Sequence, residues 1–187
     1  MRNLIRKLTL GLVLATLVGL PIYAQQVQEL TRGTGGVGQL LIGLGTSGAA
    51  RLNNVRITLT NAQVLALNTT AVTVIAAPGA GYVIDVLDGM LIFNYTGAYT
   101  VGANDDLRLW YTDRGTGPAA SNVIETTGFL DATADTIWAF SGTPDDTNPT
   151  ANTLVAIQNT SGVVFGGGNA SNQVFVDVTY VVRQTGL

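Results

Sequence analysis

The fold is decided by the stretch Gln173-Val174-Phe175-Val176-Asp177-Val178-Thr179-Tyr180-Val181-Val182-Arg183. It is rich in β-branched residues, and its side chains separate into two sets when every second residue is taken. One set is Val174, Val176, Val178 and Tyr180, and the other is Phe175, Asp177, Thr179 and Val181. A period of two predicts a β-strand whose two faces meet different surroundings.

Similar signals recur at short intervals before this stretch. Strands are predicted over residues 55–59, 71–76, 82–95, 106–112, 136–140 and 151–158. The strand over 82–95 is interrupted at Asp88-Gly89, where a bulge or a tight turn fits. Loops rich in glycine, proline, aspartate or asparagine separate the later strands, at residues 113–118, 141–149 and 166–172.

Helix signals are sparse after residue 24. Thr60 and Gln63 have the spacing of a capping box, which predicts a short helical turn through Leu67. Because no long amphipathic helix follows, a parallel α/β fold is disfavoured. The sequence therefore predicts an all-β protein, an antiparallel, jelly-roll-like β-sandwich with one short helical turn and an N-terminal arm.

The composition argues against bond-making chemistry. The 187 residues include no histidine and no cysteine, and Lys7 is the one lysine, whereas there are 25 threonines and 23 glycines. Charged residues make up 11%, against about a quarter in an ordinary soluble domain. The commonest general base, the thiol nucleophile and the soft metal ligands are thus missing. We therefore expect that the protein is not an enzyme. We predict no catalytic, cofactor-binding or metal-binding residues and no cofactor.

The N-terminus has the layout of a secretory signal peptide. Arg2, Arg6 and Lys7 precede an apolar run over residues 8–20, and a small residue, Ala24, ends the motif. This predicts cleavage after Ala24, and the alternative is an apolar arm that packs against a neighbouring subunit. Three parts follow from the sequence: residues 1–24 as this segment, residues 25–50 as a glycine-rich arm or linker, and residues 51–187 as the β-sandwich domain.

Charge and cysteine content limit the partners of the domain. Beyond residue 24 the chain carries six arginines against twelve acidic residues, a net charge of −6. Such a body has no basic surface to neutralise phosphates, which argues against nucleic-acid binding. Without cysteine there are no disulfides, so stability must come from burial or from oligomerisation.

Three kinds of possible site have simpler explanations. Residues 33–38 match G-x-G-x-x-G but lack the strand, helix and acidic residue of a dinucleotide site. Two pairs of carboxylates could suggest a glycoside hydrolase, and two oxygen-rich segments could suggest a calcium site. Solvated turns and Asx-type turns explain both patterns better. The pairs are Asp85 with Asp88 and Asp131 with Asp135, and the segments are Asn104-Asp105-Asp106 and Asp145-Asp146-Thr147-Asn148.

Two further patterns are weak. Asn68, Asn94, Asn159 and Asn169 begin glycosylation sequons, but chance matches are expected in a chain rich in asparagine and threonine. The aromatic residues could form a sugar-binding platform, although aromatic residues in strands more often lie in a core or a subunit contact. They are Tyr95, Tyr99, Trp110, Tyr111 and Trp138.

Several short motifs resemble one family in their order along the chain. They are Leu59-Thr60-Asn61-Ala62-Gln63-Val64-Leu65-Ala66-Leu67-Asn68-Thr69-Thr70, Val72-Thr73-Val74-Ile75-Ala76-Ala77-Pro78-Gly79-Ala80-Gly81, Leu107-Arg108-Leu109-Trp110-Tyr111-Thr112-Asp113 and Phe129-Leu130-Asp131-Ala132-Thr133-Ala134-Asp135. The order resembles the small virion structural proteins of tailed phages and prophages, which include head decoration proteins. The resemblance implies a β-sandwich subunit that sits on a capsid or tail, as a homotrimer.

From these observations we expect a capsid decoration, or cement, protein of a bacteriophage virion. Its partners would be the major capsid protein or other virion subunits and its own copies, with no nucleic acid and no small-molecule substrate. The arm over residues 33–50 would reach an adjacent subunit, and the loops 96–105, 141–149 and 166–172 would face outward or meet the shell. The alternative is a secreted bacterial surface or matrix protein, exported by residues 1–24, with an adhesive or glycan-binding role.

Overall fold

The computed structural model describes residues 41–42, 50–102, 104–143 and 149–185. All described residues belong to one compact unit, Gln39–Leu187. The predicted N-terminal segment 1–24 and most of the predicted arm 25–50 lie outside the described residues. No helix among the described residues is long and apolar enough to cross a membrane.

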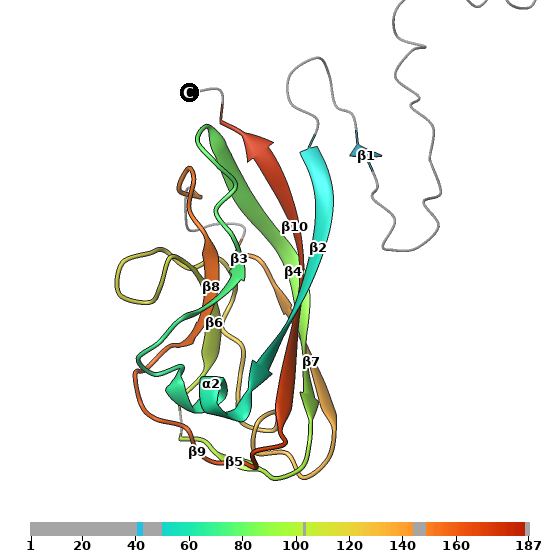
Figure 1. Cartoon of the computed structure of the whole chain (residues 1–187), viewed down its shortest axis with the longest axis vertical. Helices are drawn as coiled ribbons and strands as arrows, with labels where there is room; N and C mark the ends of the chain where they lie inside the picture. Colours follow the sequence, from blue (N-terminus) through green and yellow to red (C-terminus); the bar gives the residue numbers. More distant parts are fainter. Residues whose placement is uncertain (1–40, 43–49, 103, 144–148, 186–187) are drawn as a thin grey trace, which may run out of the picture. The chain divides into compact units, whose positions relative to one another are not determined.

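Two antiparallel sheets face each other in this unit, which confirms the predicted all-β sandwich (Figure 1). The five-stranded sheet has the order β1-β2-β10-β4-β7, and the three-stranded sheet has the order β3-β8-β6. Their strands are β1 (Leu41–Ile42), β2 (Ala50–Thr60), β10 (Gln173–Gln184), β4 (Tyr82–Asn94), β7 (Thr136–Ser141), β3 (Val72–Ile75), β8 (Val155–Asn159) and β6 (Leu107–Tyr111). A two-residue ladder pairs β5 (Tyr99–Thr100) with β9 (Gly166–Gly167).

The connection between β6 and β7 joins the two sheets along one side. We call residues 119–124 the seam segment. On one side it bonds β6, where the Ile124 N–H donates to the Leu107 carbonyl over 2.8 Å and the Leu107 N–H donates back over 2.9 Å. On the other side the Asn122 N–H donates to the Ser141 carbonyl of β7 over 3.0 Å. The seam segment adds a fourth member to the three-stranded sheet, beside β6. The other sheet has four strands longer than two residues, so the arrangement resembles an eight-stranded jelly roll.

The core lies between the sheets, and the central strand β10 supplies its middle. Val174, Val176 and Val178 are fully buried, as the alternation predicted. From the other sheet Leu107, Leu109 and Tyr111 point inward. The Tyr111 hydroxyl donates a hydrogen bond of 2.8 Å to the Ile84 carbonyl on β4, and thus ties the two sheets together. Burial raises the pKa of Tyr111 to about 12.

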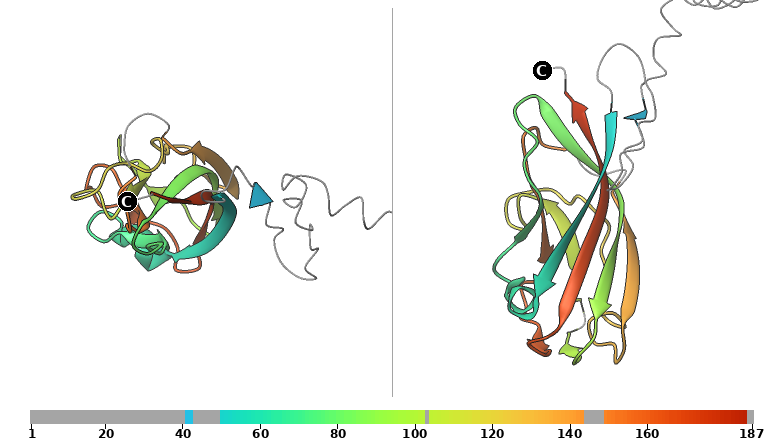
Figure 2. Two further views of the ribbon diagram at one scale, coloured as in Figure 1. Left: turned by 90° about the horizontal axis from the view of Figure 1, so that it is seen from above. Right: turned by 45° about the vertical axis from the view of Figure 1, so that its right-hand side comes forward.

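The predicted capping box begins the one short helix in the described part of the chain, α2 (Asn61–Ala66). The Gln63 N–H donates to the Thr60 hydroxyl oxygen over 3.4 Å, and the Thr60 N–H donates to the Gln63 side-chain oxygen over 2.9 Å. Val64 and Leu67 are buried against the sandwich. The helix closes one end of the core (Figure 2).

Strand β4 departs from the predicted break in an informative way. It continues through Asp88-Gly89, and the irregularity is a bulge at Leu87, which has no partner on β10. Gly89 is needed for a different reason, because a Cβ there would lie 2.3 Å from both the Asp177 carbonyl oxygen and the Phe140 ring. The glycine thus allows β4, β10 and Phe140 to approach closely.

Three short strands and the beginnings of two longer strands were not predicted. Strand β2 begins at Ala50, five residues before the predicted start at residue 55. Strands β1, β5 and β9 have only two residues each, too short for an alternating pattern to register. The strand expected over residues 151–158 begins at Val155, because residues 151–152 form a turn in which Asn152 has a positive φ of 55°.

Candidate interaction surfaces

The outer face of the five-stranded sheet is built from cross-strand rows. Thr58 on β2 is opposite Phe175 on β10, which is opposite Ile92 on β4, and Ile92 is opposite Ile137 on β7. The next row runs from Arg56 through Asp177 and Met90 to Ala139. Since the alternate residues of these strands point into the core, both rows face away from the three-stranded sheet.

These rows gather apolar side chains on a face that no other described element covers. We call Met90, Ile92, Ile137, Ala139 and Phe175 the apolar strip. Ile137 is 65% exposed and Met90 is 43% exposed, whereas Ile92 and Phe175 are half-buried among their neighbours. The strip therefore presents contiguous apolar surface beside the sheet edge at β7.

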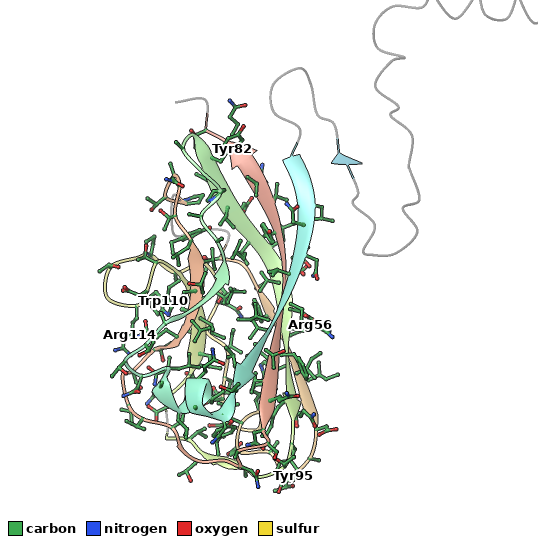
Figure 3. All side chains as sticks on the ribbon, in the orientation of Figure 1. Arg56, Tyr82, Tyr95, Trp110 and Arg114 are labelled. Atoms are coloured by element: carbon green, nitrogen blue, oxygen red, sulfur yellow. The ribbon has the colours of Figure 1, made fainter. Side chains whose placement is uncertain are left out.

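A neutralised ion pair borders the strip. The Arg56 Nε atom donates to Asp177 Oδ1 over 2.6 Å, and a second contact joins Arg56 Nη2 to Asp177 Oδ2. The guanidinium carbon of Arg56 lies 5.7 Å from the centroid of the Phe175 ring, and Figure 3 shows Arg56 pointing away from the core. The hydrogen bond to Asp177 raises the pKa of Arg56. The pair removes the charge that a lone Asp177 would place beside the strip.

Two of the three predicted contact loops meet at one end of the sandwich. The loop over residues 96–102 reaches the segment 166–172 through the β5–β9 ladder and through the buried side chain of Asn172. The Asn172 Oδ1 atom accepts from the Thr96 N–H over 2.9 Å, and its amide nitrogen donates to the Gly97 carbonyl over 2.6 Å. These bonds hold the two loops in one arrangement. Of the third loop, 141–149, residues 144–148 lie outside the described residues.

Beside these loops, two neighbouring valines are exposed. Val163 is 54% exposed and Val164 is 61% exposed. The buried Asn159 side chain positions them, since its amide nitrogen donates to the Val163 carbonyl over 2.5 Å and its oxygen accepts from the Gly162 N–H over 3.0 Å. The valine pair is therefore a second apolar contact point, on a loop that a buried side chain fixes.

The oxygen-rich segment Asn104-Asp105-Asp106 serves the local turns. One oxygen of the buried Asp105 carboxylate accepts from the Gly102 N–H over 2.9 Å, and the other accepts from the Ser161 hydroxyl over 2.6 Å. Burial, together with the nearby Glu125, raises the pKa of Asp106. No group of three or more acidic side chains that could hold a metal ion occurs among the described residues. The segment 145–148 lies outside them.

The carboxylate pairs weighed for hydrolysis have separate structural partners. Asp85 forms an ion pair with Arg183, with a shortest distance of 2.7 Å, while Asp88 lies beyond the bulge, opposite Thr179 and Ser141. Asp131 Oδ1 accepts from the Gly128 N–H over 2.5 Å, and Asp135 Oδ1 accepts from the Tyr95 N–H over 2.9 Å. These contacts place the carboxylates in turns and in an ion pair rather than around one cleft.

A hollow of about 360 Å³ lies next to the Asp85–Arg183 pair. Its lining residues are Asp85, Val86, Tyr111, Ala120, Thr143, Pro149 and Arg183. The two charged groups bond each other and the Tyr111 hydroxyl bonds the Ile84 carbonyl, so their polar atoms are already engaged within the chain.

The five aromatic residues do not form one platform. Tyr99 and Tyr111 are buried, and Trp138 packs against the core. Trp110 lies on the outer face of the three-stranded sheet, with the Arg108 guanidinium carbon 5.4 Å from its ring centroid. Figure 3 places Trp110 near the middle of the sandwich and Tyr95 at one end.

Among the sequon asparagines, Asn159 is fully buried and bonded through both side-chain atoms. It is therefore closed to glycosylation in the folded chain. Asn94 and Asn169 are exposed and Asn68 is half-buried. The G-x-G-x-x-G stretch at 33–38 lies outside the described residues.

Comparison with known proteins gives a likeness to solved structures but no match in sequence. No family model matches the chain, and no curated protein matches it. A chain of the cyanophage Pam1 capsid asymmetric unit is similar, with a TM-score of 0.42 and 18% sequence identity. The alignment covers 83% of this chain and 98% of that chain.

Proposed function

We propose that this chain is a structural protein of a tailed-phage virion that decorates the capsid and binds across neighbouring shell subunits. It acts by contact rather than by catalysis, and it works as a homo-oligomer on the outside of the shell. The observation that carries the proposal is the apolar strip, because it places Ile137 and Met90 in solvent on an otherwise regular sheet face.

The strip is the kind of surface that a protein partner covers. Monomeric proteins seldom expose contiguous apolar patches beyond a few hundred Å² unless the patch is functional. The Arg56–Asp177 pair next to it is already neutralised, so covering the strip would leave no unpaired charge from these two residues. A protein partner with a matching apolar surface suits this face better than a charged ligand does.

The second contact region is the loop end that carries Val163 and Val164. It suits a decoration protein because a subunit that touches a repeating shell at two places binds more tightly than either contact alone would allow. The resemblance noted in the motifs supports the same function and implies a trimer on the capsid or tail.

The proposal is tested on particles from a strain that produces the protein. After density-gradient purification, we expect the chain in the particle fraction, accessible to antibodies on intact particles. Met90→Lys, within the strip, should lower the amount bound at least tenfold. Thr58→Lys, exposed on the same face at the opposite edge, should bind like the unchanged chain. Absence of the chain from particles, or full binding by Met90→Lys, would contradict the proposal.

The signal-like residues 1–24 favour one alternative, an exported bacterial surface or matrix protein with an adhesive role. Intact-mass spectrometry of the native protein separates the two. A particle-bound chain that retains these residues supports the virion protein, whereas a chain cleaved after Ala24 and recovered from the cell surface supports the exported one.

A further inference from the structure

Strand β7 forms one edge of the five-stranded sheet, with β4 as its one neighbour in the strand order. The Ser141 carbonyl and N–H both point away from β4, because they bond the Asn122 N–H and the Asn122 side-chain oxygen. In a strand the backbone groups of alternate residues point the same way. Ile137 and Ala139 therefore also direct their N–H and C=O groups to the open side.

The seam segment bonds β7 at Ser141 and forms a bridge with Gly142 just beyond it. No hydrogen bond joins the backbone groups of Ile137 and Ala139 to another described residue on the open side. The side chains beside them belong to the apolar strip. The edge thus combines unpaired backbone groups with an apolar flank.

Edge strands usually carry features that prevent pairing, such as charged side chains, proline or a covering element. Strand β7 has the sequence Thr-Ile-Trp-Ala-Phe-Ser, which contains no charged residue and no proline. At the other side of the sheet, β2 carries the charged Arg56 and pairs with β1 at Ala50 and Arg51. Of the two sides of this sheet, the β7 edge is therefore the better suited to accept another strand.

We infer that β7 pairs in antiparallel orientation with β7 of a second copy of this chain. Backbone hydrogen bonds would join Ile137 and Ala139 of the two copies. A second copy fits because antiparallel pairing of one strand with itself is symmetric, with the same residues contributed from both sides. It also fits electrostatically, since two copies of equal negative charge meet with the least repulsion where the surface is neutral.

Pairing would join two five-stranded sheets into one continuous sheet and place the two apolar strips side by side. This deepens the proposed function, because one paired unit would then offer the shell a doubled contact face. The inference itself rests on the β7 edge and not on the phage assignment. A two-fold contact makes pairs, so the trimer implied by the family resemblance would need another contact.

The test is the mass of the purified full chain, measured by sedimentation velocity across a concentration series. We expect a dimer. Ala139→Pro removes an N–H that the monomer does not use, and proline is tolerated at such edge positions, so this variant should be monomeric with an unchanged melting temperature. Ile137→Lys should weaken dimerisation at least tenfold, while Thr58→Lys in the same cross-strand row should leave it unchanged.

Hydrogen exchange gives an independent readout at the edge. The amides of Ile137 and Ala139 should be protected in the dimer, and the Ile137 amide should exchange rapidly in Ala139→Pro. A monomer at all concentrations, a trimer, or a dimer that persists in both edge variants would overturn the inference. A dimer that does not bind particles would leave the inference standing and contradict the proposed function.

Discussion

Arg56 and Asp177 lie 121 residues apart in the sequence and form a two-point ion pair across the centre of the outer sheet face. Asp177 is 8% exposed, so its charge depends on this one arginine for compensation within the pair. Arg56 also covers one side of the Phe175 ring. The pair therefore fixes the register of β2 against β10 and borders the apolar strip.

Replacing Arg56 by methionine should destabilise the fold, because it leaves the Asp177 carboxylate poorly solvated and unpaired. The matched control is Arg183→Met, which breaks the more exposed Arg183–Asp85 pair, whose Asp85 side chain is 36% exposed. Thermal unfolding should show a clearly larger drop for Arg56→Met. Equal drops would mean that the burial of Asp177 does not matter.

Tyr111→Phe should cost about 1–3 kcal/mol at neutral pH, because the Ile84 carbonyl loses its buried donor. The pH profile is a second readout. The pKa of Tyr111 is raised from 10.0 to about 12, so its stabilising effect is complete below pH 10 and is lost as the pH rises toward 12. Urea unfolding at several pH values should show a steeper fall over this range for the unchanged chain than for Tyr111→Phe.

Gly89→Ala should destabilise the protein by about 1–3 kcal/mol, the usual cost of overpacking a core. The added methyl group would press on the Asp177 carbonyl and the Phe140 ring. Gly115→Ala is the control, since its Cβ would meet one side-chain atom, of Asp113, at 3.4 Å. Chemical denaturation of both variants should give a marked loss for Gly89→Ala alone. A neutral Gly89→Ala would show that β4 and β10 can separate at little cost.

Thr60→Ala should cost about 1 kcal/mol by removing the helix cap of α2. Thr58→Ala, two residues earlier on the exposed face of β2, serves as the control and should be close to neutral. The free energy of unfolding of the two variants decides between them. If both lose the same stability, the capping bonds contribute nothing beyond strand propensity.

Asn172→Ala should release the loop end without unfolding the sandwich, because the Thr96 N–H and the Gly97 carbonyl lose their partner. Limited proteolysis should then cut within residues 96–102 or 166–171 faster than in the unchanged chain. Asn169→Ala, which removes a single exposed bond to the Ser171 N–H, should be cut at nearly the original rate. Unchanged cleavage in Asn172→Ala would mean that the β5–β9 ladder alone holds these loops.

Local patterns were enough to predict the longer strands and the short helix. The alternation in β10 gave the buried Val174, Val176 and Val178, and the capping box gave α2, because each signal lies within a dozen residues. Beyond Thr179, where the pairing with β4 shifts register, Val181 of the other set is buried and Tyr180 is only half-buried. The seam segment has no such pattern, because Asn122 and isolated bridges hold it in place rather than the pairing of a regular strand.

The apolar strip could not be predicted in the same way. Ile92, Ile137 and Phe175 each occupy the outward position of a different strand, where one apolar side chain is ordinary. They become a surface only through the register of β4 with β7 and with β10. A signal existed in the apolar residues at outward positions of several strands, but it has meaning only once the strand order is known.

The position of β10 between β2 and β4 also governs how the protein is made in the cell. Every other described strand leaves the ribosome before β10. Until then β2 and β4 lack the strand that pairs with both of them in the sheet. During that interval their valine and leucine faces are open to other nascent chains, and contacts between distant segments form slowly. The five-stranded sheet can therefore close only after β10 has been synthesised.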